Sequence, residues 1–221
     1  MKSMAASVCR TSARTFFGLI FLLLAGCTLP LPDKPARPQL YDLGPALPLA
    51  AAGAQPGGAV LALDPVAAPA TFDSVAIIYR LAYAEGGQQA RSYALARWSM
   101  PPPQLLAQRL REAFSVTRPV VDADAGLAAL ELRAELDEFT HVFTAPGVSE
   151  GVVRLRVTIA RTTADAHTSR LLGQRTFSAR QPAPSADASG GAAALRAATD
   201  DVVQQVVGWA DAIDFSSGKR P

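Results

Sequence analysis

The chain has 221 residues, a formal net charge of +2, 49% hydrophobic and 18% charged residues, two cysteines and two histidines. This length indicates one domain of ordinary size, with or without appendages. The small net charge argues against a dedicated nucleic-acid binder, and the few cysteines and histidines argue against a disulfide-dense scaffold and a histidine-based metal site.

Residues 1–26 are predicted to be a lipoprotein signal peptide. Three basic residues precede an unbroken apolar run over 16–25, whose helical length of about 15 Å is half a bilayer core and therefore too short to span it. Leu24-Ala25-Gly26-Cys27 then matches the bacterial lipobox, in which the signal peptidase cuts between Gly26 and Cys27 and the sulfur of Cys27 carries the lipid. An ordinary secretory signal with an incidental Cys27 is the alternative.

Cleavage before Cys27 changes the composition of the remaining chain. Removing 26 of 221 residues leaves 195, and it removes three bases but no acid, so 18 bases remain against 19 acids. Cys9 is lost and Cys27 is acylated, so no free thiol remains, as suits an oxidising compartment. Thr28 follows the cysteine, whereas an Asp there favours retention in the inner membrane. We therefore expect a lipid-anchored protein on the periplasmic face of the outer membrane.

Residues 27–40 are predicted to be the lipidated cysteine and a tether. Four prolines between Thr28 and Gln39 favour an extended polyproline II conformation, which could span up to roughly 37 Å. The folded domain is expected over 41–213, with a flexible connection near 45–58 and a C-terminal tail over 214–221.

Hydrophobic periodicity predicts seven strands and two helices in this domain. The strand-like segments are 41–43, 60–64, 75–84, 91–98, 128–143, 153–160 and 171–179. A glycine pair within 85–89 joins two of them as a hairpin, and Ala145-Pro146-Gly147 forms a later turn. One helix opens at prolines 101–103, and the other covers 192–213 after a loop over 181–191. The expected fold class is a single α/β domain, with a mixed, mostly antiparallel sheet of about six or seven strands and two helices packed on it.

No motif for catalysis, cofactor binding or metal binding stands out. Glu138 and His141 are an odd number of residues apart on a predicted strand, so they should lie on opposite faces, and we expect a solvated or strand-end histidine. The segment 122–126 begins like a calcium loop but lacks later oxygen ligands, which favours a turn. We therefore predict no cofactor and no enzymatic activity, while a Ser, Asp or Glu enzyme without a recognisable motif stays open.

One group of residues could form a partner-binding edge at the base of the hairpin. It consists of Tyr79, Arg80, Tyr93, Arg97 and Trp98. Tyrosine, tryptophan and arginine dominate the energetics of interfaces, which favours this interpretation. The structural alternative is that the tryptophan packs in the core behind a strand-to-helix corner, with the neighbouring arginine in solvent.

The order of these motifs resembles the family of ABC-type transport auxiliary lipoproteins, which includes the lipoprotein of the paraquat-inducible Pqi system. The resemblance covers roughly 41–210. It rests on the lipobox, Tyr41-Asp42-Leu43, Ile78-Tyr79-Arg80, Tyr93, Arg97-Trp98, Pro101-Pro102, the Leu-rich helix and a terminal helix with Trp209. It implies an α/β fold and supplies no catalytic or lipid-binding residue.

The resemblance also implies a function and partners. The family works with an ABC permease, its ATPase and a protein with an MCE (mammalian cell entry) domain, in phospholipid transport between membranes. We expect a non-ATPase component that docks such an assembly at the outer membrane. A homo-oligomer is compatible with this role, although no residue pattern indicates one. The alternatives are a periplasmic lipid carrier, which needs an apolar cavity of several hundred cubic ångströms, and a structural envelope lipoprotein.

Overall fold

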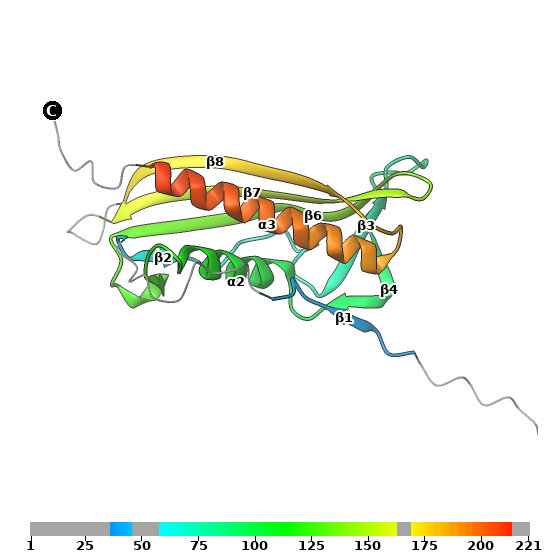
Figure 1. The fold of residues 1–221 in the computed structure, drawn as a ribbon, viewed down its shortest axis with the longest axis horizontal. Coiled ribbons are helices and arrows are strands. Elements are labelled where there is room, and N and C mark those ends of the chain that lie inside the picture. The colour runs from blue at the N-terminus through cyan, green and yellow to red at the C-terminus, as the bar shows by residue number, and fades with distance from the viewer. Residues whose placement is uncertain (1–35, 46–57, 163–168, 214–221) are drawn as a thin grey trace, which may run out of the picture. The chain divides into compact units, whose positions relative to one another are not determined.

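The computed structural model of the chain describes residues 36–45, 58–162 and 169–213 (Figure 1). The predicted cleavage site at Gly26 and Cys27, most of the tether, His167 and the tail lie outside these residues. The chain divides into two units after Ala36, and the second unit holds every described helix and strand. None of the described helices is long and apolar enough to cross a membrane.

The described residues form one mixed sheet of eight strands. The strands are β1 (Gln39–Tyr41), β2 (Leu61–Leu63), β3 (Ala76–Leu81), β4 (Arg91–Trp98), β5 (Val120–Asp122), β6 (Leu130–Ala145), β7 (Val148–Thr162) and β8 (Ser169–Pro182). The long strands β6, β7 and β8 form an antiparallel meander. Along the other edge of β6, β2 pairs in parallel with its first half and β3 with its last residues. The predicted fold class is confirmed, with β5 as one strand more than expected.

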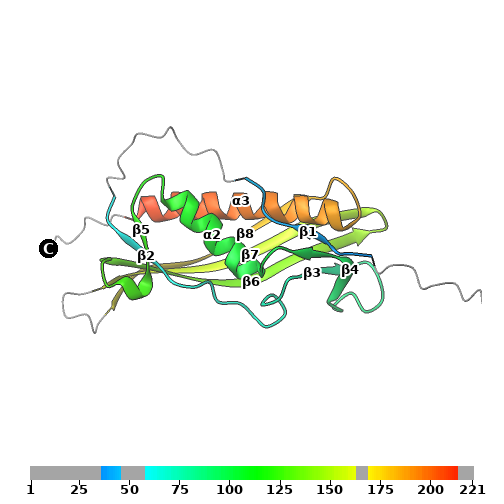
Figure 2. The same cartoon turned by 90° about the horizontal axis from the view of Figure 1, so that it is seen from below.

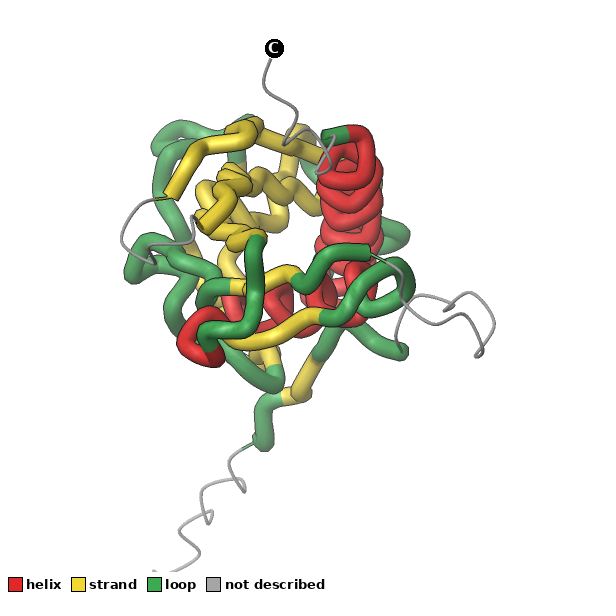
Figure 3. Tube along the Cα trace, turned by 90° about the vertical axis from the view of Figure 1, so that its left-hand side faces the viewer, coloured by secondary structure: helices red, strands yellow, loops and turns green. Residues whose placement is uncertain are grey.

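Two long helices cover one side of this sheet, α2 (Pro102–Phe114) and α3 (Ala188–Ala212) (Figure 2). In α2 the fixed φ of proline suits the first positions, where the missing N–H has no intrahelical partner to lose. Leu106, Leu110 and Phe114 follow at four-residue spacing, and all three are fully buried. Figure 3 shows α3 end-on, beside the strands.

Alternate residues of the meander form the core between sheet and helices. Leu132 and Leu136 of β6 and Leu155 of β7 are fully buried, as the predicted alternation requires. A register shift between Leu136 and Glu138 then moves Phe139 to the helix side, whereas strict alternation would place the glutamate there. The bulge therefore keeps a carboxylate out of the core.

The opposite face of the meander carries ion pairs between neighbouring strands. Arg154 of β7 lies 2.5 Å from Glu138, and Arg156 lies 3.1 Å from Glu135 and 3.2 Å from Asp137. Pairs exposed to this degree stabilise a protein by less than about 1 kcal/mol each. This face therefore contributes solubility and strand register more than stability.

Candidate functional site

The predicted hairpin is present. Strands β3 and β4 pair in antiparallel orientation, and Gly86 in their connection has a φ of +79°, which favours glycine. The structure places the five predicted partner-binding residues on this hairpin, but it divides them among three surroundings.

Trp98 belongs to the core. Its side chain is 1% exposed and packs edge-to-face on Phe139, with ring centroids 5.5 Å apart. The adjacent Arg97 is exposed and has no ion-pair partner among the described residues. The structural alternative is therefore confirmed for these two residues, because consecutive strand residues point to opposite faces.

Arg80 and the two tyrosines also lie on opposite faces of the hairpin. The guanidinium of Arg80 lies 3.1 Å from Glu138 on the outer, charged face. Tyr79 and Tyr93 pack together on the helix side, with ring centroids 4.6 Å apart. The structure thus brings the tyrosines together and separates them from both arginines.

The tyrosines lead to His141, the buried centre of an aromatic cluster. The Tyr93 hydroxyl lies 2.8 Å from Nδ1 of His141, whose ring centroid lies 4.5 Å from that of Phe143. The histidine is fully buried, so the expectation of a solvated or strand-end residue is wrong. The reason is that β6 continues to Ala145, which leaves this position between β3 and β7. Glu138 does lie on the opposite face, as predicted.

Helix α3 begins directly over this cluster. The carboxylate of Asp187 accepts the N–H of Gly190 at 2.8 Å and the hydroxyl of Ser185 at 2.8 Å, and these hydrogen bonds lower the pKa of the Asp187 carboxyl. A Cβ at Gly191 would lie 2.3 Å from Nδ1 of His141. The helix therefore starts within the predicted loop, because glycine permits a contact that no other residue could make.

The cluster is uncharged at neutral pH. Burial lowers the pKa of His141 to about 4, against an opposing effect of Asp187, and burial raises the pKa of Tyr93. The hydrogen bond between the Tyr93 hydroxyl and Nδ1 of His141 joins β4 to β6 beneath α3. Because the ring is covered on all sides, its chemical role here is packing and orientation.

Sequence reasoning missed Arg109, a buried cation in α2. Its side chain is 2% exposed and donates to the backbone oxygens of Leu43 and, at 2.9 Å, Pro45. Its Nε lies 3.2 Å from Asp200 of α3. The detectable signal was an arginine at a position of α2 that helical spacing assigns to the apolar face. Arg109 therefore connects the segment after β1 to α2, where it lies, and to α3 through Asp200.

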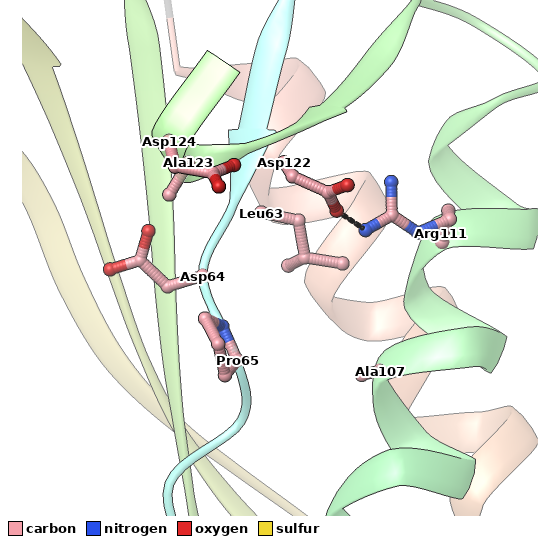
Figure 4. A pocket seen from close by; sticks show the side chains of 8 residues that line it. All are labelled: Leu63, Asp64, Pro65, Ala107, Arg111, Asp122, Ala123 and Asp124. Carbon is pink, nitrogen blue, oxygen red and sulfur yellow. Dashed lines mark hydrogen bonds and ion pairs between the residues drawn. The ribbon is translucent and has the colours of Figure 1, made fainter. Parts of the chain in front are cut away.

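A pocket of about 440 Å³ opens between α2 and the ends of β2 and β5 (Figure 4). Arg111 and Asp122 form a 2.5 Å ion pair across it, above the apolar side chains of Leu63 and Ala107. The neighbouring acidic segment forms a short 3₁₀ helix, Ala123–Ala125, followed by a left-handed Gly126. The predicted turn is thus confirmed.

Known structures share this fold. A DUF330 protein from Xanthomonas campestris is 22% identical, with a TM-score of 0.64 over 78% of this chain and 94% of that one. An uncharacterized protein is 13% identical, with a TM-score of 0.61 over 79% of this chain and 99% of that one. At these identities the likeness concerns the fold alone. No curated protein is significantly similar to the chain in sequence.

A family model gives a more specific result. The model for the ABC-type transport auxiliary lipoprotein component matches residues 41–207. This range includes the hairpin, all of α2, α3 as far as Val207, and the whole sheet except the first residues of β1. The match covers well over half of the chain. The chain therefore belongs to the family of ABC-type transport auxiliary lipoprotein components.

Proposed function

We propose that this lipoprotein docks an ABC/MCE-type phospholipid transport assembly at the outer membrane. The family match over 41–207 is the observation that carries the proposal. The partners would be an MCE-domain protein, an ABC permease and its ATPase, with ATP hydrolysis in the last of these. This chain would be their non-ATPase envelope component.

The proposal requires an anchor at Cys27 on the periplasmic face of the outer membrane. Two or three acyl chains on one cysteine would hold the protein there almost permanently, since each buried methylene contributes about 0.8 kcal/mol. Metabolic labelling with a fatty acid should mark the full-length protein, and Cys27→Ala should abolish the label. Cys9→Ala, in the signal peptide, is the matched control and should keep it. Labelling that persists in Cys27→Ala would contradict the anchor.

The interior favours docking over lipid carriage. Trp98, Phe114 and Phe139 fill the space between sheet and helices, each with a side chain at most 1% exposed. An acyl chain could enter there only by displacing side chains packed at crystal-like density. The pocket beside α2 is lined by four charged residues and four apolar ones, so it is the one place described here that a carrier could use, and its charged residues are Asp64, Arg111, Asp122 and Asp124.

Photo-crosslinking in living cells would test docking. A photoreactive residue would replace Arg97, Leu127 or Leu171 in turn, all three of which are exposed. Capture of the MCE-domain protein from at least one position, lost in a strain that lacks that protein, is the expected result. If each variant is produced and correctly localised but none captures a transporter subunit, docking is refuted.

Mass spectrometry of the purified, lipid-anchored protein separates docking from carriage. A docking protein should release no stoichiometric phospholipid beyond its covalent acyl chains. One phospholipid per domain would favour the carrier, and it would require the core described above to open.

A further inference from the structure

The first turns of α3 have little apolar surface with which to hold their place. Residues 188–193, which we call the α3 start, have no side chain larger than serine. Two of them are glycines, and glycine disfavours a helix because it loses more backbone freedom than other residues on folding. The first large side chain of the helix is Leu195, which is fully buried. The position of the α3 start therefore depends on contacts that neighbouring residues provide.

Asp187 and His141 provide these contacts. The carboxylate of Asp187 accepts the N–H of Gly190 at 2.8 Å, and its backbone oxygen accepts the N–H of Gly191 at 2.9 Å. Gly191 also rests on the imidazole ring, since a Cβ there would lie 2.3 Å from Nδ1 of His141. Figure 1 shows α3 beginning beside the β3–β4 hairpin, whose Tyr93 is hydrogen-bonded to the same ring. The α3 start is thus seated directly on a titratable group.

The rest of α3 is held far more firmly. A Cβ at Gly151 of β7 would lie 2.5 Å from the backbone of both Ala194 and Leu195, so helix and strand are in close contact at this point. Beyond it, Val202 and Val203 are fully buried. A segment with few buried apolar contacts opens at a lower free energy than the whole domain. We therefore place a hinge at Ala194, between the α3 start and the rest of the helix.

The surroundings of His141 disfavour a charge. The ring is fully buried, and its Nε2 has no hydrogen-bond partner among the described residues. Tyr79 of β3 and Tyr93 of β4 face it with neutral rings, and its partner in β7 is Gly151. Of the carboxylates that the structure describes, Asp187 is the one that raises the pKa of the imidazole, but burial outweighs it and lowers the pKa to about 4.

We propose that the α3 start is an acid-sensitive latch, in which protonation of His141 favours a state with residues 188–193 lifted off the ring. In this open state the imidazolium reaches water, so its charge is no longer buried. Acid would thereby raise the population of the open state without unfolding the domain. Opening would uncover His141, Tyr79 and Tyr93, and a ligand that binds these rings would bind more tightly in acid. The inference depends neither on the lipid anchor nor on a transport partner.

Native-state hydrogen exchange measured by NMR tests the latch in the processed chain, which begins at Cys27. The reporters are the amides of Gly190 and Gly191, both bonded to Asp187, and the fully buried Val203 of the same helix is the internal control. Dividing each rate by the intrinsic rate at that pH gives the opening equilibrium. From pH 7.5 to 4.5 it should rise about seventyfold at the two glycines, for a pKa of 6.5 in the open state and about 4 in the closed state.

Urea separates local opening from unfolding. Low concentrations should leave exchange at Gly190 and Gly191 almost unchanged, because the opening exposes little surface, whereas exchange at Val203 should accelerate. His141→Gln does not titrate and should abolish the pH response of the two glycines. Asp187→Asn keeps an N-cap oxygen but removes the carboxylate that favours the protonated ring in the closed state, so the response should become larger.

Two results would overturn the proposal. The first is that Gly190 and Gly191 exchange with the same protection and urea dependence as Val203, because the α3 start would then open only with the whole domain. The second is a pH response that persists in His141→Gln. If that variant does not fold, Asp187→Asn decides the question, since a response no larger than that of the wild type would refute the role of the ring.

Discussion

Acidification should destabilise the domain through His141, which is fully buried and has a pKa lowered by burial to about 4. In the unfolded chain the same imidazole has the ordinary pKa of 6.5. Between these two values the unfolded state binds a proton that the folded state excludes. The folded state is therefore stable above pH 6.5 and loses stability as the pH falls from 6.5 to 4.

The size of this effect follows from the two pKa values. Each pH unit within the window costs about 1.4 kcal/mol, so the whole window costs about 3 kcal/mol. The contact with Gly191 leaves no space for a water molecule against Nδ1, and the Tyr93 hydroxyl is already hydrogen-bonded to that nitrogen. A protonated ring would donate to the Tyr93 oxygen instead, but its charge would be buried and its Nε2–H has no hydrogen-bond partner among the described residues.

The assay is urea unfolding at a series of pH values, followed by the fluorescence of the buried Trp98. His141→Gln keeps an acceptor for Tyr93 but does not titrate. The difference in unfolding free energy between wild type and His141→Gln should therefore shrink by about 3 kcal/mol from pH 6.5 to 4. Carboxyl groups such as Asp200, whose pKa burial raises, titrate in both proteins and cancel. A difference that is independent of pH would refute the reasoning.

Two further predictions concern packing and the buried cation. Gly191→Ala should lower the unfolding free energy by about 3 kcal/mol, because its Cβ would overlap His141, whereas Gly208→Ala, with open space around its Cβ on the same helix, should raise it by about 0.5–1 kcal/mol. Arg109→Ala should cost about 3–5 kcal/mol by leaving buried groups unpaired, and Arg111→Ala, which breaks an exposed ion pair, should cost less than about 0.5 kcal/mol. Urea midpoints measure all four changes, and equal losses within either pair would contradict the assigned contacts.

Most elements could be predicted because their apolar period was regular. The alternation of Leu130, Leu132 and Leu136 gave β6, and the four-residue spacing in α2 gave the first helix. Strand β5 was missed because three residues, Val120–Asp122, are too short to show a period and pair only with β2. Its existence depends on a tertiary contact.

The start of α3 was missed for a different physical reason. Two consecutive glycines disfavour a helix by about 1 kcal/mol each, so sequence reasoning favours a loop. In the structure Gly190 lies against Ser185, and Gly191 lies against the His141 ring, so both positions require the absence of a side chain. The close packing of helix on strand compensates for the low propensity, and this compensation is invisible before the strand partner is known.

The predicted partner-binding group could be identified as a set of unusual residues, but its geometry could not. Residue type alone does not reveal that a register shift lies between Ala76 and Ile78, where β3 pairs with β4. That irregularity lets Tyr93 face the helices and Arg97 face outward although both have odd numbers. A bulge changes the face of every later residue in a strand, so period-two reasoning fails beyond it.

The same hairpin explains how the tether is joined to the fold. Tyr41 of β1 is in register with the buried Trp98, and its oxygen accepts the N–H of Ser99 at 2.7 Å. A few residues after Tyr41, the backbone oxygens of Leu43 and Pro45 accept hydrogen bonds from the guanidinium of Arg109. Tension on the tether would therefore reach the core tryptophan and the helix pair within a few residues. If the protein docks a transport assembly as proposed, these contacts would pass load from the membrane into the domain without unfolding its first strand.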